Sequence, residues 1–469
     1  MKKNARKNII DSDAQLYSES DTSSSDNFDL ITNLVAPLPR KRPPTKKRLQ
    51  KEETSDDETD DLTAKFTEKP TDIRINFVKN ILEGNRLKPM IDFNNVYAPV
   101  NTKLTKQILS VKDQFSSMGL RLRYLRSGTT GHTFKAVSKT DKNFELAVKV
   151  CAYPKDDYGH INNSGRPENV ELRILKLLSQ FVCTKGSPHF VLPVGSFNAS
   201  IIDFVDIPQS IIDLDDPKNK MYKRFIMRYR KGHYEDYVSV LVSEWANGGD
   251  LLDYIRKNYM KLTLKDWIVF IFQILFTLSL VQKKYPSFRH NDMKANNILV
   301  QLTNIVNAPP YYCYNMDGVK FIIPNINMQI KIWDFDFACI GGEIENNKVN
   351  SDWTRKMNIT NKENKYYDMH YFFNTLISER FLPKFYDGGA PQEIVDFVHR
   401  IIPEEFRKPG RYVNDKGRIQ IDREYTTPYK VIMNDPLFAK YRHVHTTMST
   451  RGPYSMRKPD VPEPRKSRK

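Results

Sequence analysis

The sequence predicts an α+β chain with two lobes, a small β-rich first lobe and a larger helical second lobe. From about residue 120, short apolar stretches alternate with polar residues and glycines, which is typical of strands. Residues 262–283 then follow a long amphipathic to apolar helix pattern. A chain of 469 residues with 39% hydrophobic content is long enough for one bilobal domain with tails, or for two or three compact domains. Strands first and helices later favour the two lobes.

Both ends of the chain are expected to be disordered tails. Residues 1–70 alternate acidic, serine-rich pieces with the basic run 40–48 and hold few apolar residues. The serine clusters are either phosphorylation sites or solvated linker. The basic run resembles a nuclear-import signal or an anion-binding patch, and a merely solvated tail explains it equally well. Residues 442–469, rich in Pro, Ser, Arg and Lys, are expected to form a basic flexible tail.

Composition limits the compartment and the partners. Lysine and arginine outnumber acidic residues by 73 to 56, and the net charge of +17 favours anionic partners without identifying one. The four cysteines form no CxxC pair, so we expect no disulfide framework or zinc site, and a reducing compartment. The N-terminus lacks an apolar signal core, and the apolar stretch 267–281 contains Gln273 and is too short to span a bilayer. We therefore expect a soluble, intracellular protein.

A helical extension, residues 71–117, is expected to brace the first lobe. Its first helix places Ile73, Phe77, Ile81 and Leu82 at helical spacing before a glycine, and a second helix should cover about 102–118. The expected boundaries after it are 118–246 for the first lobe, with an insertion at about 198–236, and 247–441 for the second lobe, with an insertion at about 302–326.

The strongest chemical signal is the segment FRHNDMKANNILV at 288–300. A single Asp or Asn in a loop usually marks a turn, but His290, Asp292, Lys294 and Asn297 at this spacing seldom coincide by chance. The segment resembles the catalytic loop of protein kinases, with HND in place of HRD. The resemblance implies that Asp292 accepts the substrate hydroxyl proton, Lys294 steadies the transferred phosphate and Asn297 binds the second metal ion.

A second segment, IKIWDFDFA at 330–338, is a short apolar strand that ends in acids. Taken alone it fits a turn with surface carboxylates. Beside the catalytic-loop resemblance it is similar to the metal-binding DFG segment, with Asp336 in place of the glycine. Asp334 is then the implied Mg²⁺ ligand, because a hard cation needs oxygen ligands. The resemblance thus implies ATP and Mg²⁺ as cofactors.

Upstream, RSGTTGHT at 126–133 resembles the glycine-rich loop of the same family, with Arg126 in place of its first glycine. Gly128 and Gly131 are expected to let backbone N–H groups approach the phosphates. A short Gly-x-x-Gly is also common hairpin chemistry, so this segment depends on the strand that follows it.

That strand, ELAVKV at 145–150, resembles the one that bears the phosphate-pairing lysine of kinases. The resemblance implies that Lys149 pairs with the phosphates and that Ala147 contacts the nucleotide. The next helix offers Glu171 as the acid that pairs with this lysine, with Glu168 one turn earlier as the alternative.

The link between the lobes is expected in VLVSEWANGGDL at 240–251. By resemblance, the backbone from Glu244 to Ala246 faces adenine, Asp250 reaches the ribose, and Leu299 of the second lobe completes the nucleotide site.

Two matches extend the resemblance to about residues 118–440. Asp368 resembles the buried acid that holds the catalytic loop, although a helix N-cap is a rival explanation, and 427–438 resembles the final helix of kinase domains. The departures are HND, the missing APE motif at the end of the activation segment, and the first-lobe insertion. With these departures the chain is most similar to the divergent serine/threonine kinases of poxviruses and mimiviruses.

The resemblance implies an ATP- and Mg²⁺-dependent kinase of protein serine and threonine hydroxyls, and Lys294 two positions after Asp292 favours protein over small-molecule substrates. The alternatives are a small-molecule phosphotransferase of the same fold, a catalytically weak kinase-fold scaffold, and a basic nucleic-acid-binding protein. The last lacks any zinc, RNP-type or helix-turn-helix signature. The expected partners are ATP and protein substrates, with accessory nucleic-acid or acidic-surface contact through the basic tails. We expect a monomer.

Control of activity is expected to differ from kinases that are switched on by activation-segment phosphorylation. In those kinases an arginine before the catalytic Asp pairs with the new phosphate, and here that position is Asn291, which carries no charge. The segment contains Ser351, Thr354 and Thr360, yet it should be held by fixed packing or by a partner.

Overall fold

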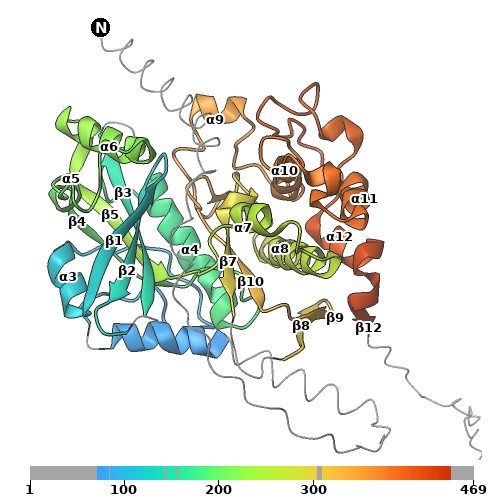
Figure 1. The fold of residues 1–469 in the computed structure, drawn as a ribbon, viewed down its shortest axis with the longest axis horizontal. Helices are drawn as coiled ribbons and strands as arrows, with labels where there is room; N and C mark the ends of the chain where they lie inside the picture. The colour runs from blue at the N-terminus through green and yellow to red at the C-terminus, as the bar shows by residue number, and fades with distance from the viewer. Residues whose placement is uncertain (1–70, 84, 142–143, 156–157, 304–308, 445–469) are drawn as a thin grey trace, which may run out of the picture.

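The computed structural model describes residues 71–83, 85–141, 144–155, 158–303 and 309–444. A β-sheet lobe precedes a helical lobe (Figure 1), so the predicted two-lobed, kinase-like α+β architecture is confirmed. The predicted tail 1–70, with its basic run 40–48, and residues 445–469 of the predicted tail 442–469 lie outside the described residues.

The first lobe is built on a five-stranded antiparallel sheet with strand order β1-β2-β3-β5-β4. Its strands are β1 (Leu120–Ser127), β2 (His132–Ser138), β3 (Glu145–Pro154), β4 (Pro193–Ser200) and β5 (Tyr234–Glu244). Alternation places Phe134 and Ala136 of β2 in the core, whereas Thr133 and Lys135 lie on the other face. Helix α4 (Pro167–Cys183) packs beside the sheet, between it and the second lobe (Figure 1).

The helical extension differs in detail from its prediction. The first helix, 71–82, buries Val78 and Ile81, whereas Ile73, expected on its apolar face, is 58% exposed. The predicted second helix at 102–118 is wrong in its first half, because only α3 (Val111–Ser117) is helical. The backbone just before it instead hydrogen-bonds to Asn198 of β4 in a strand-like bridge.

The first-lobe insertion is folded. Strand β4 continues to Ser200 and β5 begins at Tyr234, so the predicted insertion 198–236 narrows to the residues between them. It contains α5 (Ile202–Val205), a 3₁₀ turn (Pro217–Asn219) and α6 (Lys220–Arg230). The buried Tyr222 of α6 packs its ring against Tyr124 of β1 and His132 of β2, at 5.2 and 4.7 Å between centroids.

The second lobe surrounds one long buried helix, α8 (Leu264–Lys284), which begins with a capping box formed by Thr263 and Asp266. Its central Gln273 is satisfied within the core, since its amide bonds the backbone of Met328 and Ile330. Among the described residues α8 alone has the length and composition of a membrane span, and 78% of its apolar window is buried inside the molecule. It is therefore a core helix here.

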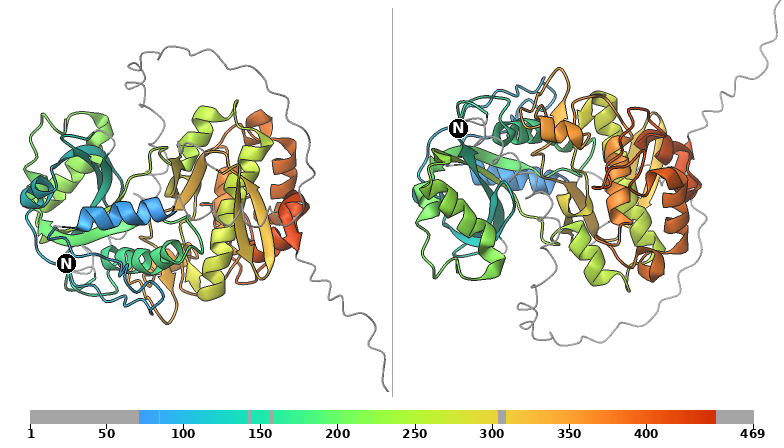
Figure 2. Two further views of the ribbon diagram at one scale, coloured as in Figure 1. Left: turned by 90° about the horizontal axis from the view of Figure 1, so that it is seen from below. Right: turned by 90° about the horizontal axis from the view of Figure 1, so that it is seen from above.

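The other second-lobe helices pack around α8 (Figures 1 and 2), and they are α7 (Leu251–Asn258), α10 (Tyr367–Leu376), α11 (Gln392–Ile401) and α12 (Pro428–Asn434). A short helix, α9 (Asp352–Lys356), lies in the segment that precedes α10.

Short strand pairs complete the second lobe. Strand β7 (Ile298–Leu302) pairs with β10 (Met328–Ile332), and β6 (Phe288–Arg289) pairs with β11 (Cys339–Ile340). The insertion expected at 302–326 carries the hairpin of β8 (Tyr311–Met316) and β9 (Val319–Pro324). The predicted tail from residue 442 is wrong at its start, because β12 (Arg442–Val444) adds a third strand to this hairpin.

Candidate active site

One buried lysine joins the two lobes. Strand β3 presents Lys149, which donates hydrogen bonds to Oε1 of Glu171 at 2.6 Å and to Oδ1 of Asp334 at 2.8 Å. Glu171 comes from α4 and Asp334 from the second lobe, so three distant parts of the chain meet at one ammonium group. Glu168, the alternative partner, instead pairs with Arg166 at 3.2 Å.

Charge in this cluster stabilises the protonated lysine. Burial opposes protonation, but the carboxylates of Asp334 and Glu171 hold the pKa of Lys149 well above its usual value. Burial would raise the pKa of Asp334, and the adjacent Lys149 ammonium outweighs it and lowers that pKa. An ionised Asp334 beside a cationic lysine is suited to binding phosphate and a divalent cation.

The catalytic-loop residues are brought together around Asp292. Its Oδ2 accepts a hydrogen bond from Nδ2 of Asn297 at 2.9 Å and lies 3.4 Å from Nζ of Lys294. Although burial favours the neutral acid, the charges of Lys294 and Arg418 lower the pKa of Asp292 to about 2. The carboxylate is therefore ionised and can accept a hydrogen bond from a substrate hydroxyl.

Two contacts hold the catalytic loop in place. The carboxylate of Asp368 in α10 accepts the backbone N–H groups of His290 at 2.7 Å and Asn291 at 2.9 Å, which matches the expected buried acid rather than a helix N-cap. The ring nitrogen Nε2 of His290 lies 3.0 Å from the carbonyl oxygen of Trp333. This contact ties the catalytic loop to the segment that carries Asp334.

The glycine-containing turn lies flat against β3. A Cβ on Gly131 would lie 2.9 Å from Sγ of Cys151 and 3.2 Å from the carbonyl of Val150, so a side chain would not fit there. The N–H of Gly128 donates to the carbonyl of Gly131 at 2.8 Å. The approach of the Gly128 N–H group to phosphate stays a prediction. It would require this turn to open, because the N–H group already donates to Gly131.

The link between the lobes approaches β7 closely. A Cβ on Gly248 would lie 2.7 Å from the side chain of Val300, and Gly249 has a φ of +74°, which explains the glycine pair. Asp250 caps α7 with Oδ1, forms a backbone bridge with Leu299 and lies 3.4 Å from Arg126.

The other residues expected near the nucleotide differ in how far their side chains are buried and in what they contact. Ala246 is buried at the link, and Ala147 lies half-buried on β3, two residues before the lysine. The side chain of Glu244 points into an ionic cluster with Arg74 and Lys331, at 2.6 and 2.7 Å. Burial opposes ionisation, yet these two cations lower the pKa of Glu244 to about 2. Only the backbone of Glu244 is thus left for the expected adenine contact.

Arg74 and Arg418 carried no signal in the sequence. Arg74, in the 71–82 helix, also donates to the carbonyls of Pro188 and Phe190 at 2.6 Å each, and so anchors the extension to the segment between α4 and β4. Arg418 donates to Oδ1 of Asp292 at 2.6 Å. Both arise from distant segments, which is why motif spacing cannot find them.

The segment after Asp334 has its own small core of four buried side chains, and these are Phe337, Cys339, Val349 and Ile359. The amide of Asn291 donates to the carbonyls of Phe337 and Thr360 at 3.0 Å each, and so joins both ends of this segment. Thr354 is fully buried. Arg289 donates to the hydroxyl of Thr360 at 2.7 Å.

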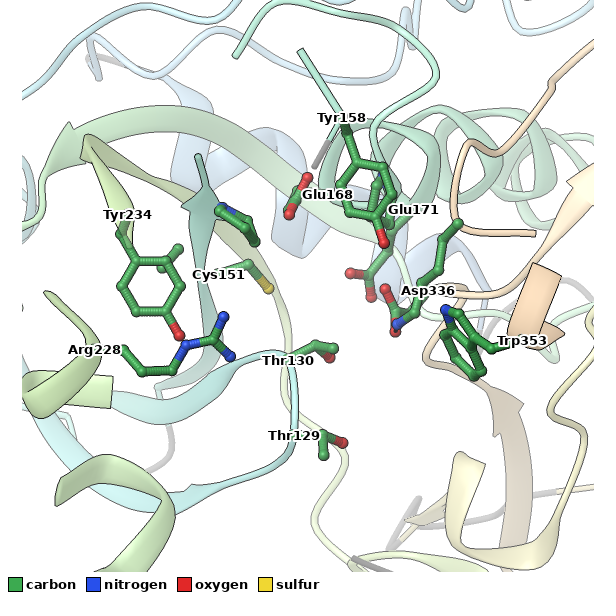
Figure 3. A pocket seen from close by; sticks show the side chains of 14 residues that line it. Thr129, Thr130, Cys151, Tyr158, Glu168, Glu171, Arg228, Tyr234, Asp336 and Trp353 are labelled. Atoms are coloured by element: carbon green, nitrogen blue, oxygen red, sulfur yellow. Dashed lines mark hydrogen bonds and ion pairs between the residues drawn. The ribbon is translucent and has the colours of Figure 1, made fainter. Parts of the chain in front are cut away.

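A pocket opens beside the lysine cluster (Figure 3). Thr129 and Thr130 of the glycine-containing turn, Glu171 of α4 and Asp336 line it, together with Arg228 of the first-lobe insertion. Asp336, in place of the glycine of DFG, forms an ion pair with Lys348. The insertion therefore contributes one wall of this pocket.

The donor set fits Mg²⁺ only in combination with phosphate. Among the described residues no group of three or more His, Cys, Asp or Glu side chains could hold a metal alone. Asp334 and Asn297 nevertheless offer side-chain oxygens at the meeting point of the two lobes, where Trp333 donates to the carbonyl of Asn297 at 3.1 Å. A magnesium site with one or two protein ligands and substrate phosphates has this composition.

The chain is similar to viral proteins that are described as serine/threonine protein kinases. The sequence model of a family described as "Poxvirus serine/threonine protein kinase" matches residues 161–407, more than half of the chain. "Putative serine/threonine-protein kinase R400" of Acanthamoeba polyphaga mimivirus is 60% identical over 82% of this chain and 83% of its own length. "Putative serine/threonine-protein kinase R301" of the same virus is 32% identical over 35% of this chain and 45% of its own length. The chain therefore belongs to the poxvirus-type serine/threonine protein kinase family.

Proposed function

We propose that this protein is an active, ATP- and Mg²⁺-dependent kinase that phosphorylates serine and threonine hydroxyls of proteins. One observation carries the proposal: Lys149 pairs with both Glu171 and Asp334, while Asp292, Lys294 and Asn297 contact one another in the adjacent loop. Phosphoryl transfer requires positioning and charge neutralisation, and these two clusters supply both.

Each charged group has a role in the proposed reaction. Asp292 accepts the hydrogen bond of the substrate hydroxyl and takes its proton as the new oxygen–phosphorus bond forms and the bond to ADP breaks. Lys294 neutralises charge on the transferred phosphoryl group, and Lys149 does so on the remaining phosphates. Asp334 and Asn297 would hold Mg²⁺, which when bound neutralises phosphate charge.

Nucleotide binding is proposed at the link between the lobes. Adenine would meet the backbone from Glu244 to Ala246, between Ala147 above and Leu299 below, and Asp250 would reach the ribose. The Arg126 side chain lies 3.4 Å from Asp250, so it would have to move for the ribose to bind there. The phosphates would lie under Gly128 and Gly131.

The activation segment is proposed to need no phosphate. The two hydrogen bonds of the Asn291 amide and the buried core around Phe337 support this. Arg289 beside the Thr360 hydroxyl is the one described contact that favours a phosphorylated alternative.

The test is purified protein with radiolabelled ATP, Mg²⁺ and a mixture of acidic and basic protein substrates, followed by phosphoamino-acid analysis. The expected products are phosphoserine and phosphothreonine. Label found only in a small molecule would favour a small-molecule phosphotransferase, and mainly phosphotyrosine would contradict the substrate class. Absence of any transfer, with ATP still bound, would favour the scaffold alternative.

A further inference from the structure

Arg418 contacts the proposed catalytic base from a distant part of the chain. Its guanidinium donates to Oδ1 of Asp292 at 2.6 Å, to the carbonyl of Asn291 and, at 3.0 Å, to the hydroxyl of Tyr367. It also lies over the ring of Tyr371, 3.9 Å from the centroid. The residue is 5% exposed. A buried arginine with this many partners has one defined orientation.

Local sequence explains how Arg418 is aimed. The hairpin 413–419 closes through Asn414, whose Oδ1 accepts the backbone N–H of Arg418 at 2.9 Å, and through Gly417, which has a φ of +75°. Asn374 of α10 donates to the carbonyl of Gly417 at 2.8 Å. The hairpin is thus fastened to the same helix that anchors the catalytic loop.

The two oxygens of Asp292 are held by different parts of the lobe. Oδ2 is bonded by Asn297 within the loop, whereas Oδ1 is bonded by Arg418. Because each oxygen accepts from a different donor, rotation of the carboxylate about its bond to Cβ would break both hydrogen bonds. A group that must accept a hydroxyl proton works only within a narrow range of orientations, and about 1 Å of misplacement can cost roughly 100-fold in rate.

We propose that Arg418 is a positioning residue for phosphoryl transfer, which fixes the Asp292 carboxylate in the orientation that receives the substrate hydroxyl. This inference rests on the proposed kinase function. Because the guanidinium is anchored by Tyr367 and Tyr371 of α10, the orientation is set by the fold of the second lobe.

The test compares three variants of the full chain. Arg418→Met keeps the apolar stem over Tyr371 and removes the guanidinium, Arg418→Lys keeps one charged donor, and Arg400→Met is the control. Arg400 also forms a two-bond pair with an aspartate, Asp435, but on the exposed face of α11. The measurements are kcat, KM for ATP, the dissociation constant of ATP and the thermal midpoint.

The expected result is a fall in kcat of about 10- to 100-fold for Arg418→Met, with ATP affinity within about threefold of the wild type. Arg418→Lys should recover at least part of the loss, and Arg400→Met should leave kcat unchanged. In an Asp292→Asn background, Arg418→Met should cost no further rate, since it acts through that carboxylate.

Three results would overturn the inference. If the wild type is active and Arg418→Met has the same kcat, Asp292 does not need Arg418 to hold its orientation. A further loss on top of Asp292→Asn, or a parallel loss of ATP affinity and thermal midpoint without rescue by lysine, would assign Arg418 a purely structural role. A wild type that transfers no phosphate would overturn the proposed function itself, and this inference with it.

Discussion

The catalytic loop and the glycine-containing turn face the same site but are built in opposite ways. In the loop, His290 and Asn291 are fully buried, and the backbone is held by Asp368 and Arg418 from distant segments. The turn has one internal backbone hydrogen bond, and the Arg126 side chain beside it is 60% exposed. The loop of the second lobe is thus held in place by contacts from distant segments, whereas the turn of the first lobe is held by local contacts.

This difference explains where the chain departs from the kinase pattern. Arg126 in place of a glycine lies at the exposed turn, where a side chain can point to solvent. Asn291 in place of an arginine lies in the buried loop, and its amide makes two hydrogen bonds to the segment that follows Asp334. Departures in the loop therefore come with compensating contacts.

The largest expected effect comes from the loop. Asp292→Asn removes the proton acceptor but keeps the side-chain shape, so phosphate transfer should fall by at least about 10²- to 10⁴-fold. ATP binding should change little, whereas the thermal midpoint should fall, because the buried Arg418 guanidinium loses the charge of its partner. Calorimetry measures the two quantities separately. Activity retained within about tenfold would contradict the role assigned to this residue.

The next effect tests the junction of the two lobes. Lys149→Met leaves Glu171 and Asp334 without their shared cation, and kcat/KM for ATP should fall by about 10²- to 10³-fold. The thermal midpoint should also fall, because a buried ion pair has lost one partner. Steady-state kinetics together with a melting curve checks both. A normal rate would place the phosphate-binding cation elsewhere.

A moderate effect is expected where the loop is anchored. Asp368→Asn replaces an acceptor that serves two backbone N–H groups, and one buried donor loses its partner at a cost of about 1–3 kcal/mol in unfolding free energy. Chemical denaturation measures this directly. Asp396→Asn, on the exposed side of α11, is the matched control and should be nearly neutral. Equal effects of the two variants would show that the loop does not depend on this anchor.

A small effect is expected in the first-lobe turn. Arg126→Gly restores the glycine of the kinase pattern and removes a long, 3.4 Å ion pair between the exposed Arg126 side chain and the buried Asp250, which is worth about 0–1 kcal/mol. KM for ATP should therefore stay within about fivefold of the wild-type value. A larger change in either direction would mean that Arg126 itself controls access of the nucleotide.

The two lobes, and the candidate residues that the fold brings together, could be named from the sequence because those features are encoded locally. The apolar pattern of α8 and the spacing of Asp292, Lys294 and Asn297 lie within short windows. The first half of the predicted helix at 102–118 was wrong, because the backbone at 107–109 pairs with Asn198 of the edge strand β4, a tertiary contact that overrides the local pattern. The tail predicted from residue 442 was wrong for the same reason, since β12 pairs with β9.

The long-range supports of the site could not be predicted. Arg418 follows a Gly-containing turn, and its sequence context predicts an ordinary exposed residue. Arg74 lies on the polar face of the helix that the sequence predicts. Each becomes visible only when the fold brings it to Asp292 or Glu244. Charged residues with distant partners leave no periodicity in the sequence.

We propose that the second lobe assembles its site by fixed packing, without added phosphate. The most direct measurement is the rate of wild-type protein after phosphatase treatment, with the unmodified state verified by mass spectrometry. The predicted result is a rate within about twofold of the untreated protein, because Asn291 and the Phe337 core hold the segment with uncharged contacts. A loss of more than about tenfold that maps to Ser351, Thr354 or Thr360 would contradict the claim, and at Thr360 it would identify Arg289 as the phosphate-binding residue.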